Sequence, residues 1–299
     1  MNQARTKARD KAVCAAISAV ASQLKPLGDS SWRFTLLNGA PHVVTARIND
    51  DWLMLEAECE GEAQPRGLFW DALVRNSSLE CLAKVVLAQD VGLRLRAELP
   101  ILEDVDLGTR VGEACRGFEA EWTHTGNHSY QKVSSNDEES RIDLKGLCTE
   151  AGWPFAERSG GKLAVELEVP DGFCHALLIP AKQGVHIHCE IATLEDATAE
   201  CRQAVAAFLL AASGLIRMGR ASIKKSDGAA PVAQFEVVFG TAPSPLEISS
   251  ALECLSVACS ICGEEIKTLQ VPAIAERYLA LRGRGDNPEI RPTERTVTP

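Results

Sequence analysis

The amino-acid sequence predicts an α+β protein made of two tandem copies of one domain, each an antiparallel sheet with helices packed against it. Three observations support this prediction. The chain has 299 residues, about twice the length of an ordinary domain, and 45% of them are hydrophobic. Segments with period-2 patterning occur in two similar sets, offset by about 133 residues. Segments with the period of an amphipathic helix flank each set.

The first copy opens with a predicted helix and continues with three predicted strands. The helix has one apolar stripe, formed by Val13, Ile17, Val20 and Leu24. Pro26 and Gly28 are expected to end it. The strands are residues 32–37, 42–48 and 52–59, and Asn38-Gly39 provides a hairpin turn between the first two.

The second copy repeats these strands at residues 163–169, 173–180 and 185–191. An offset of about 133 residues aligns the apolar positions of the first two strands, so His175, Leu177 and Ile179 are expected on the core face. The third strands align with one residue less, which places Leu53, Leu55 and Ala57 on Val185, Ile187 and Cys189. The sequence therefore predicts a duplication.

The remainder of each copy also matches, which gives the order α-β-β-β-α-β-β-α twice. A second helix is predicted at residues 68–76 and 194–212, and a second hairpin at 82–88 with 93–99 and at 215–224 with 232–239. Each copy closes with an amphipathic helix. The predicted domains are residues 1–123 and 140–283, with a polar linker at 124–139 and a disordered tail at 284–299. The two copies could pack on each other as an intramolecular pseudo-dimer.

Charge and composition exclude several classes of protein. With 31 basic and 41 acidic residues the net charge is −10, so the chain has no basic footprint for a nucleic acid. No run of 18 uncharged apolar residues predicts a membrane span. Eleven cysteines in a chain of this length indicate reduced thiols in a cytoplasmic protein.

The order of elements and one local pattern carry a resemblance to a known superfamily. A short helix ending Leu73-Val74-Arg75-Asn76 leads into Lys84-Val85-Val86-Leu87, then into the strand from Gly92 to Pro100, and Glu103-Asp104-Val105-Asp106 starts the next helix. This layout resembles the Tir-chaperone-like superfamily, the type III secretion chaperones and their YbjN-like relatives, in two tandem copies. The resemblance implies a non-enzymatic protein that dimerises and holds an extended or apolar segment of another protein.

Two motifs are candidates for chemistry, and both have a plainer interpretation. Cys259-x-x-Cys262 could be a redox pair or half a metal site, but both cysteines fall on the apolar stripe of the last long helix. His186 and His188 share one strand face and could meet a metal, but the expected register points them away from the core. We therefore expect no enzyme, no cofactor and no metal, with a thiol- or metal-dependent enzyme at these pairs as the alternative.

The candidate partner-binding residues lie in the first copy. Trp52 and Met54 alternate with the core positions of their strand, so they occupy its outer face, where aromatic residues and methionines suit a contact surface. The helix residues Val13, Ile17 and Val20 could complete a groove. The alternative for the outer face is packing against the other half. We expect another protein as partner, and either a monomer with an internal pseudo-dimer or a homodimer.

Overall fold

The computed structural model describes residues 3–37, 43–58, 68–79, 81–88, 92–123, 142–170, 172–225 and 228–282. The first half contains α1 (Gln3–Ser18), β1 (Ala21–Gly28), β2 (Ser31–Leu36), β3 (Val43–Asn49), β4 (Trp52–Glu58), α2 (Leu68–Asn76), β5 (Lys84–Ala88), β6 (Gly92–Pro100) and α3 (Leu107–Thr123). The second half contains α4 (Leu144–Glu150), β7 (Ala156–Glu157), β8 (Leu163–Val169), β9 (Gly172–Pro180), β10 (Val185–Thr193), α5 (Ala199–Ser213), β11 (Arg220–Lys224), β12 (Val232–Phe239), α6 (Pro245–Leu269) and α7 (Pro272–Arg282). The predicted linker, residues 124–139, and the predicted tail, residues 284–299, lie outside the described residues.

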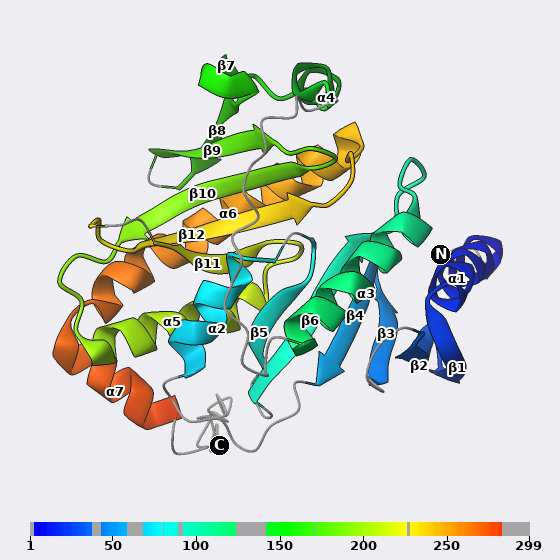
Figure 1. Ribbon diagram of the computed structural model, residues 1–299, viewed down its shortest axis with the longest axis horizontal. Coiled ribbons are helices and arrows are strands. Elements are labelled where there is room, and N and C mark those ends of the chain that lie inside the picture. The colour runs from blue at the N-terminus through cyan, green and yellow to red at the C-terminus, as the bar shows by residue number, and fades with distance from the viewer. Residues whose placement is uncertain are drawn as a thin grey trace, which may run out of the picture.

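Each half contains one six-stranded sheet, and the two sheets have the same topology (Figure 1). The strand order is β1-β2-β3-β4-β6-β5 in the first half and β7-β8-β9-β10-β12-β11 in the second, with every pair antiparallel. In the view of Figure 1, α3 crosses the first sheet and α6 crosses the second. The predicted α+β class and the tandem arrangement are confirmed.

Each sheet has one strand more than the sequence analysis predicts. The first helix ends at Ser18, and residues 21–28 form β1 instead of the helix end, so Leu24 belongs to a strand. The helical stripe therefore continues only through Val13 and Ile17, and Pro26 is compatible with β1 because β1 is the edge strand of its sheet. The second half has the short β7 at the same place.

The register of β9 also differs from the prediction. The buried residues of this strand are Ala176 and Leu178, while His175 is exposed and Ile179 pairs with His186. The strand is apolar on both parities, so patterning does not determine which face is buried. Cys174, Ala176 and Leu178 share the face that α6 approaches, and Phe173, His175, Leu177 and Ile179 lie on the opposite face.

Two elements of the second half begin later than predicted. Helix α5 begins at Ala199, because the Thr198 hydroxyl accepts a hydrogen bond from the Cys201 amide and caps the helix. Strand β11 begins at Arg220, and Leu215, expected in that strand, lies in the preceding turn with 81% of its surface exposed. The predicted bounds of α2 and β12 are confirmed.

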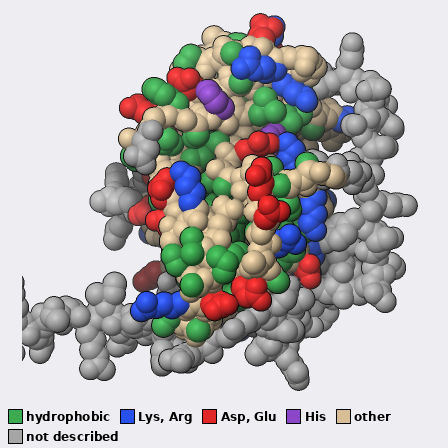
Figure 2. All heavy atoms as spheres, turned by 90° about the vertical axis from the view of Figure 1, so that its left-hand side faces the viewer, with side chains coloured by type: hydrophobic (Ala, Val, Ile, Leu, Met, Phe, Trp, Pro, Cys, Tyr) green, Lys and Arg blue, Asp and Glu red, His purple; other side chains and the backbone are tan. Residues whose placement is uncertain are grey.

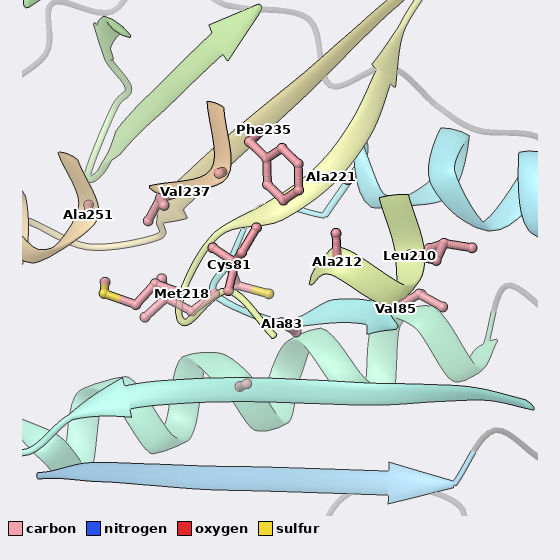
Figure 3. Packing of buried hydrophobic residues seen from close by; sticks show 14 of the residues in the cluster. Cys81, Ala83, Val85, Leu210, Ala212, Met218, Ala221, Phe235, Val237 and Ala251 are labelled. Carbon is pink, nitrogen blue, oxygen red and sulfur yellow. The ribbon is translucent and has the colours of Figure 1, made fainter. Parts of the chain in front are cut away.

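The two halves meet through a reciprocal exchange of contacts. Helix α2 of the first half packs on β11 and α5, and α5 of the second half packs on β5. The two halves thus contact each other like the subunits of a two-fold dimer, with equivalent elements on both sides. Figure 3 shows Cys81, Ala83 and Val85 of the first half beside Met218, Ala221 and other residues of the second half, in one continuous core.

A buried lysine of the first half is held by the second half. Lys84 begins β5 and has no exposed surface. Its Nζ donates to the carbonyl oxygens of Ser213, Ile216 and Gly219 at 2.7, 2.6 and 3.1 Å, and forms an ion pair with Glu98 at 2.6 Å. The lysine thereby satisfies carbonyls at the end of α5 and in the turn after it.

The equivalent residue of the second half makes the reciprocal contact. Arg220 begins β11, is buried, and forms an ion pair with Glu236 at 2.9 Å. Its guanidinium donates to the carbonyl oxygens of Cys81 at 2.6 Å and Ala83 at 3.0 Å, and also to that of Leu79. Each half therefore places one buried cation on the carbonyls that follow the second helix of the other half.

Two of the further polar contacts between the halves involve buried side chains. The Asn76 side chain accepts from the Val85 amide at 2.7 Å and donates to the Ala221 carbonyl at 2.9 Å, whose own amide donates to the Ser213 hydroxyl at 2.8 Å. The second contact joins α3 to α6, where Arg110 and Glu247 form an ion pair at 2.6 Å. Both residues of that pair are buried.

Among the described residues, α6 is the one helix whose length and mean hydropathy would suit a membrane span. One face of α6 packs on β8, β10 and β12 and on α5, and buries Ile248, Leu252, Leu255 and Ile266. This buried face contributes part of the hydropathy of α6, and the exposed residues Leu246, Val257 and Ile261 contribute another part.

The reciprocal cations generate the first prediction. Arg220→Met leaves Glu236 buried without its arginine and leaves three carbonyls without their donor, so we expect the free energy of unfolding to fall by about 3–5 kcal/mol. Denaturant titration of the full chain, followed by circular dichroism, measures this change. Arg277→Met, on the exposed side of α7, serves as the control and should change stability by no more than about 0.5 kcal/mol. A loss below about 1 kcal/mol for Arg220→Met would contradict the role of the cation.

Candidate functional site

The outer face of the first sheet has an exposed area over β1, β2 and β3. Opposed residues of an antiparallel pair share a face, so the register places Lys25 beside Arg33 and Arg33 beside Thr45 on this side. We call this area the open face and define it by its exposed side chains: Lys25, Leu27, Arg33, Leu37, Val43 and Arg47. The three apolar members are 55%, 54% and 48% exposed in the order Leu27, Leu37 and Val43.

The charged residues of the open face are all basic. Strands β1, β2 and β3 contain no aspartate or glutamate, although the chain has a net charge of −10. The acidic residues nearby lie in turns: Asp29 between β1 and β2, and Asp50 and Asp51 after β3, where these two form ion pairs with Arg217 and Arg9. Acidic and basic side chains are mixed on the side of the molecule in Figure 2, which faces away from α1 and β1. The open face therefore differs from that side in its charge.

Met54 and Trp52 continue the outer face onto β4. Met54 pairs with Arg47 across the sheet, so this half-buried side chain borders the open face directly. Trp52 is also half-buried, and the guanidinium carbon of Arg217 lies 5.2 Å from the centre of its ring. Arg217 belongs to the second half. Of the two predicted residues, Trp52 is thus covered in part by intramolecular packing.

A network of ion pairs separates the open face from the interface between the halves. Glu56 on β4 accepts from Arg96 at 2.6 Å and from Arg94 at 3.2 Å. Arg96 also donates to the Gly214 carbonyl of the second half at 2.7 Å. These contacts fix the outer face of β4 and β6 against the other half.

The predicted helix residues do not form part of the exposed surface. Val13 and Ile17 have no exposed area and belong to the core, and α1 packs against α3 and β1. Val20 lies in the turn after the helix and is half-buried against the same core. The apolar stripe was therefore identified, but its function in the described structure is to close the first half.

The histidine pair lies on the outer face of the second sheet. His186 and His188 have ring centres 5.1 Å apart, and Nε2 of His186 lies 2.9 Å from Glu236. Burial, and next the neighbouring His186, lower the pKa of His188 to about 4. Burial alone would raise the pKa of Glu236, but Arg220 and His186 lower it to about 2. The carboxylate beside the histidines is therefore already bound within the interface between the halves.

The two cysteines of the CxxC motif do not act together in the structure. Cys262 is fully buried in the core. Cys259 instead lies with Cys174 of β9 and Cys189 of β10, and the three Sγ atoms are all within 4.8 Å of one another. The Sγ atoms of Cys189 and Cys259 are 3.1 Å apart. The structure thus replaces the predicted pair by a cluster of three thiols, each from a different element.

No family model matches the chain, and no curated protein matches it. The resemblance to the Tir-chaperone-like superfamily therefore stays a prediction.

Sequence reasoning missed the basic residues of the open face and two of the clustered cysteines. The lack of acidic residues in three successive segments was visible in the sequence, and it could have identified the open face. The sequence analysis placed Cys189 and Cys259 on the core side, but the expected register of β9 put Cys174 on the opposite face, so it did not predict the cluster.

The lowered pKa of Glu236 predicts an acid-dependent contribution to stability. Because the folded pKa is lower than the unfolded pKa, this contribution is present above about pH 4.5 and is lost as the pH falls toward 2. We expect Glu236→Gln to be less stable than the wild type at pH 6, and the difference to narrow by about 2 kcal/mol at pH 3. Denaturant titrations at both pH values measure it. Glu166→Gln, exposed on the same sheet, is the control. If the stability difference between the wild type and Glu236→Gln were the same at both pH values, the lowered pKa of Glu236 would be contradicted.

Proposed function

We propose that this protein is a non-enzymatic protein-binding module whose open face holds an acidic, partly apolar segment of another protein. The observation that carries the proposal is the composition of that face. Three basic and three apolar side chains are exposed together on strands, or at strand ends, that carry no acidic residue. Interfaces match opposite charges and bury apolar side chains at their centre, so the complementary occupant is acidic and apolar.

The side chains of the open face suit this role better than the free edge of its sheet. Strand β1 is the outermost strand, but Lys25 and Pro26 lie in its middle, and its pairing with β2 is irregular at two places. Lysine, proline and bulges are the features that prevent an edge strand from pairing with another chain. We therefore propose binding through side chains across the strands rather than through main-chain pairing at the edge.

The second half supports the open face without forming it. Arg217 covers Trp52, and the Gly214 carbonyl binds Arg96, so the border of the face is fixed by the other half. A surface fixed in advance loses less conformational freedom when it binds. This arrangement favours a binding platform, and it gives the duplication a role in the proposed function.

A peptide selection tests the proposal. The immobilised full chain is presented with a display library of random 12-residue peptides, and the enriched peptides are synthesised and titrated. We expect enriched peptides to combine acidic and apolar residues. We expect Arg33→Glu with Arg47→Glu to weaken their binding at least tenfold, because the variant places like charges against the peptide. Higher salt should weaken binding to the wild type.

The matched control is Arg277→Glu, which changes the charge of an exposed arginine on α7. This variant should bind the same peptides as the wild type, and circular dichroism should show that all variants are folded. Enriched peptides without acidic residues, or equal binding by the double variant, would overturn the proposal. Salt-dependent self-association in sedimentation, lost in the double variant, would instead identify a second copy of the chain as the occupant.

A further inference from the structure

Three cysteine side chains converge in the second half, beneath α6. Cys174 is on β9, Cys189 is on the neighbouring β10, and Cys259 is on α6, which packs on both strands. Cys189 is fully buried, while Cys174 and Cys259 are partly exposed. The cluster therefore has one side in the core and another within reach of solvent.

Other cysteines of the chain show what a cysteine used only for packing looks like. Cys148, Cys201 and Cys262 have no exposed surface, and none of them belongs to a group of three metal-ligand side chains in the described part of the chain. The predicted role as core residues fits these cysteines. It does not account for three sulfur atoms that meet at one partly accessible place.

The three sulfur atoms lie close together. The Sγ atoms of Cys189 and Cys259 are 3.1 Å apart, and the Sγ atom of Cys174 lies within 4.8 Å of both. The thiolate is the form of cysteine that binds metals. The cluster thus offers three sulfur atoms that could bind one ion together as thiolates.

The number of ligands distinguishes between metals. A structural zinc site has four protein ligands in tetrahedral geometry, and the described residues supply no fourth histidine, cysteine or carboxylate to this cluster. Three sulfur atoms in a plane around one ion, each about 2.3 Å from it, are about 4 Å apart. The observed separations, 3.1 Å between Cys189 and Cys259 and at most 4.8 Å within the cluster, differ from that value by no more than about 1 Å.

We propose that Cys174, Cys189 and Cys259 form a three-thiolate site for a soft, thiophilic cation of the Cu(I) class. Thiolates select such cations over the harder ions that prefer oxygen ligands. Each metal–sulfur bond replaces an S–H bond where the sulfur is still protonated, and that proton is released to the buffer. The metal keeps its oxidation state, so the step requires no oxidant or reductant.

Titration with Cu(I) tests the site. The full chain is purified under argon and titrated with Cu(I) in competition with a chromophoric Cu(I) chelator, and X-ray absorption counts the bound sulfur atoms. We expect one tightly bound ion with three sulfur ligands. Cys174→Ala and Cys259→Ala, both at partly exposed positions, should weaken binding by more than roughly tenfold and reduce the sulfur count to two.

The matched control is Cys262→Ala, which removes a thiol from the same helix and should bind Cu(I) like the wild type. Circular dichroism shows whether each variant is folded. Loss of binding in the folded Cys262→Ala variant would overturn the proposal in favour of the CxxC pair. It would also be overturned if the wild type bound Zn(II) with four ligands and left Cu(I) to the chelator. A Cys189–Cys259 disulfide in the chain purified under argon, found by peptide mapping without reductant, would equally exclude it.

Discussion

The structure depends on two buried cations, one from each half, which bind carbonyl oxygens of the other half. Lys84 and Arg220 begin equivalent strands, and each donates to three carbonyls of the opposite half. Burial lowers the pKa of Lys84, and Glu98 counteracts that effect. A buried charge without partners costs several kcal/mol, so neither strand end is stable without the other half. The two copies are therefore parts of one folding unit rather than two independent domains.

This polar exchange fixes the geometry that the apolar contacts leave open. Interleaved α2, α5, β5 and β11 bury a continuous core, but apolar side chains tolerate small shifts of one half against the other. Hydrogen bonds to particular carbonyls do not tolerate such shifts, because a shift would leave buried donors and acceptors unsatisfied. Arg96 and Trp52 contact Gly214 and Arg217, which lie in the turn whose carbonyls Lys84 binds, so the border of the open face depends on the interface between the halves.

The sequence predicted what local patterning determines and missed what distant partners determine. Alternation and turn residues located the duplicated strands, and helical stripes located α2, α3 and α6. Strand β1 was missed because a lysine and a proline interrupt its pattern. The register of β9 was wrong because both of its faces are apolar. A lysine within a strand is typical of a solvated face, and Lys84 is buried only because carbonyls more than a hundred residues away receive it. The thiol cluster required the same long-range information, since it joins three elements through the β9 register.

The differences between the two copies indicate where each has acquired its own chemistry. On the outer faces, basic Arg33 and Arg47 lie over β2 and β3, whereas Glu166 and Glu168 lie on the exposed side of the equivalent β8. On the inner faces, the position of Cys189 is occupied in the first copy by Ala57, and both are buried. Neither difference is needed for the shared topology, because both copies form the same sheet with different residues at these positions. The residues that form the shared sheet topology are thus distinct from those that form the two candidate sites. The open face depends on basic residues of the first copy, and the thiol cluster depends on cysteines that only the second copy has at these positions.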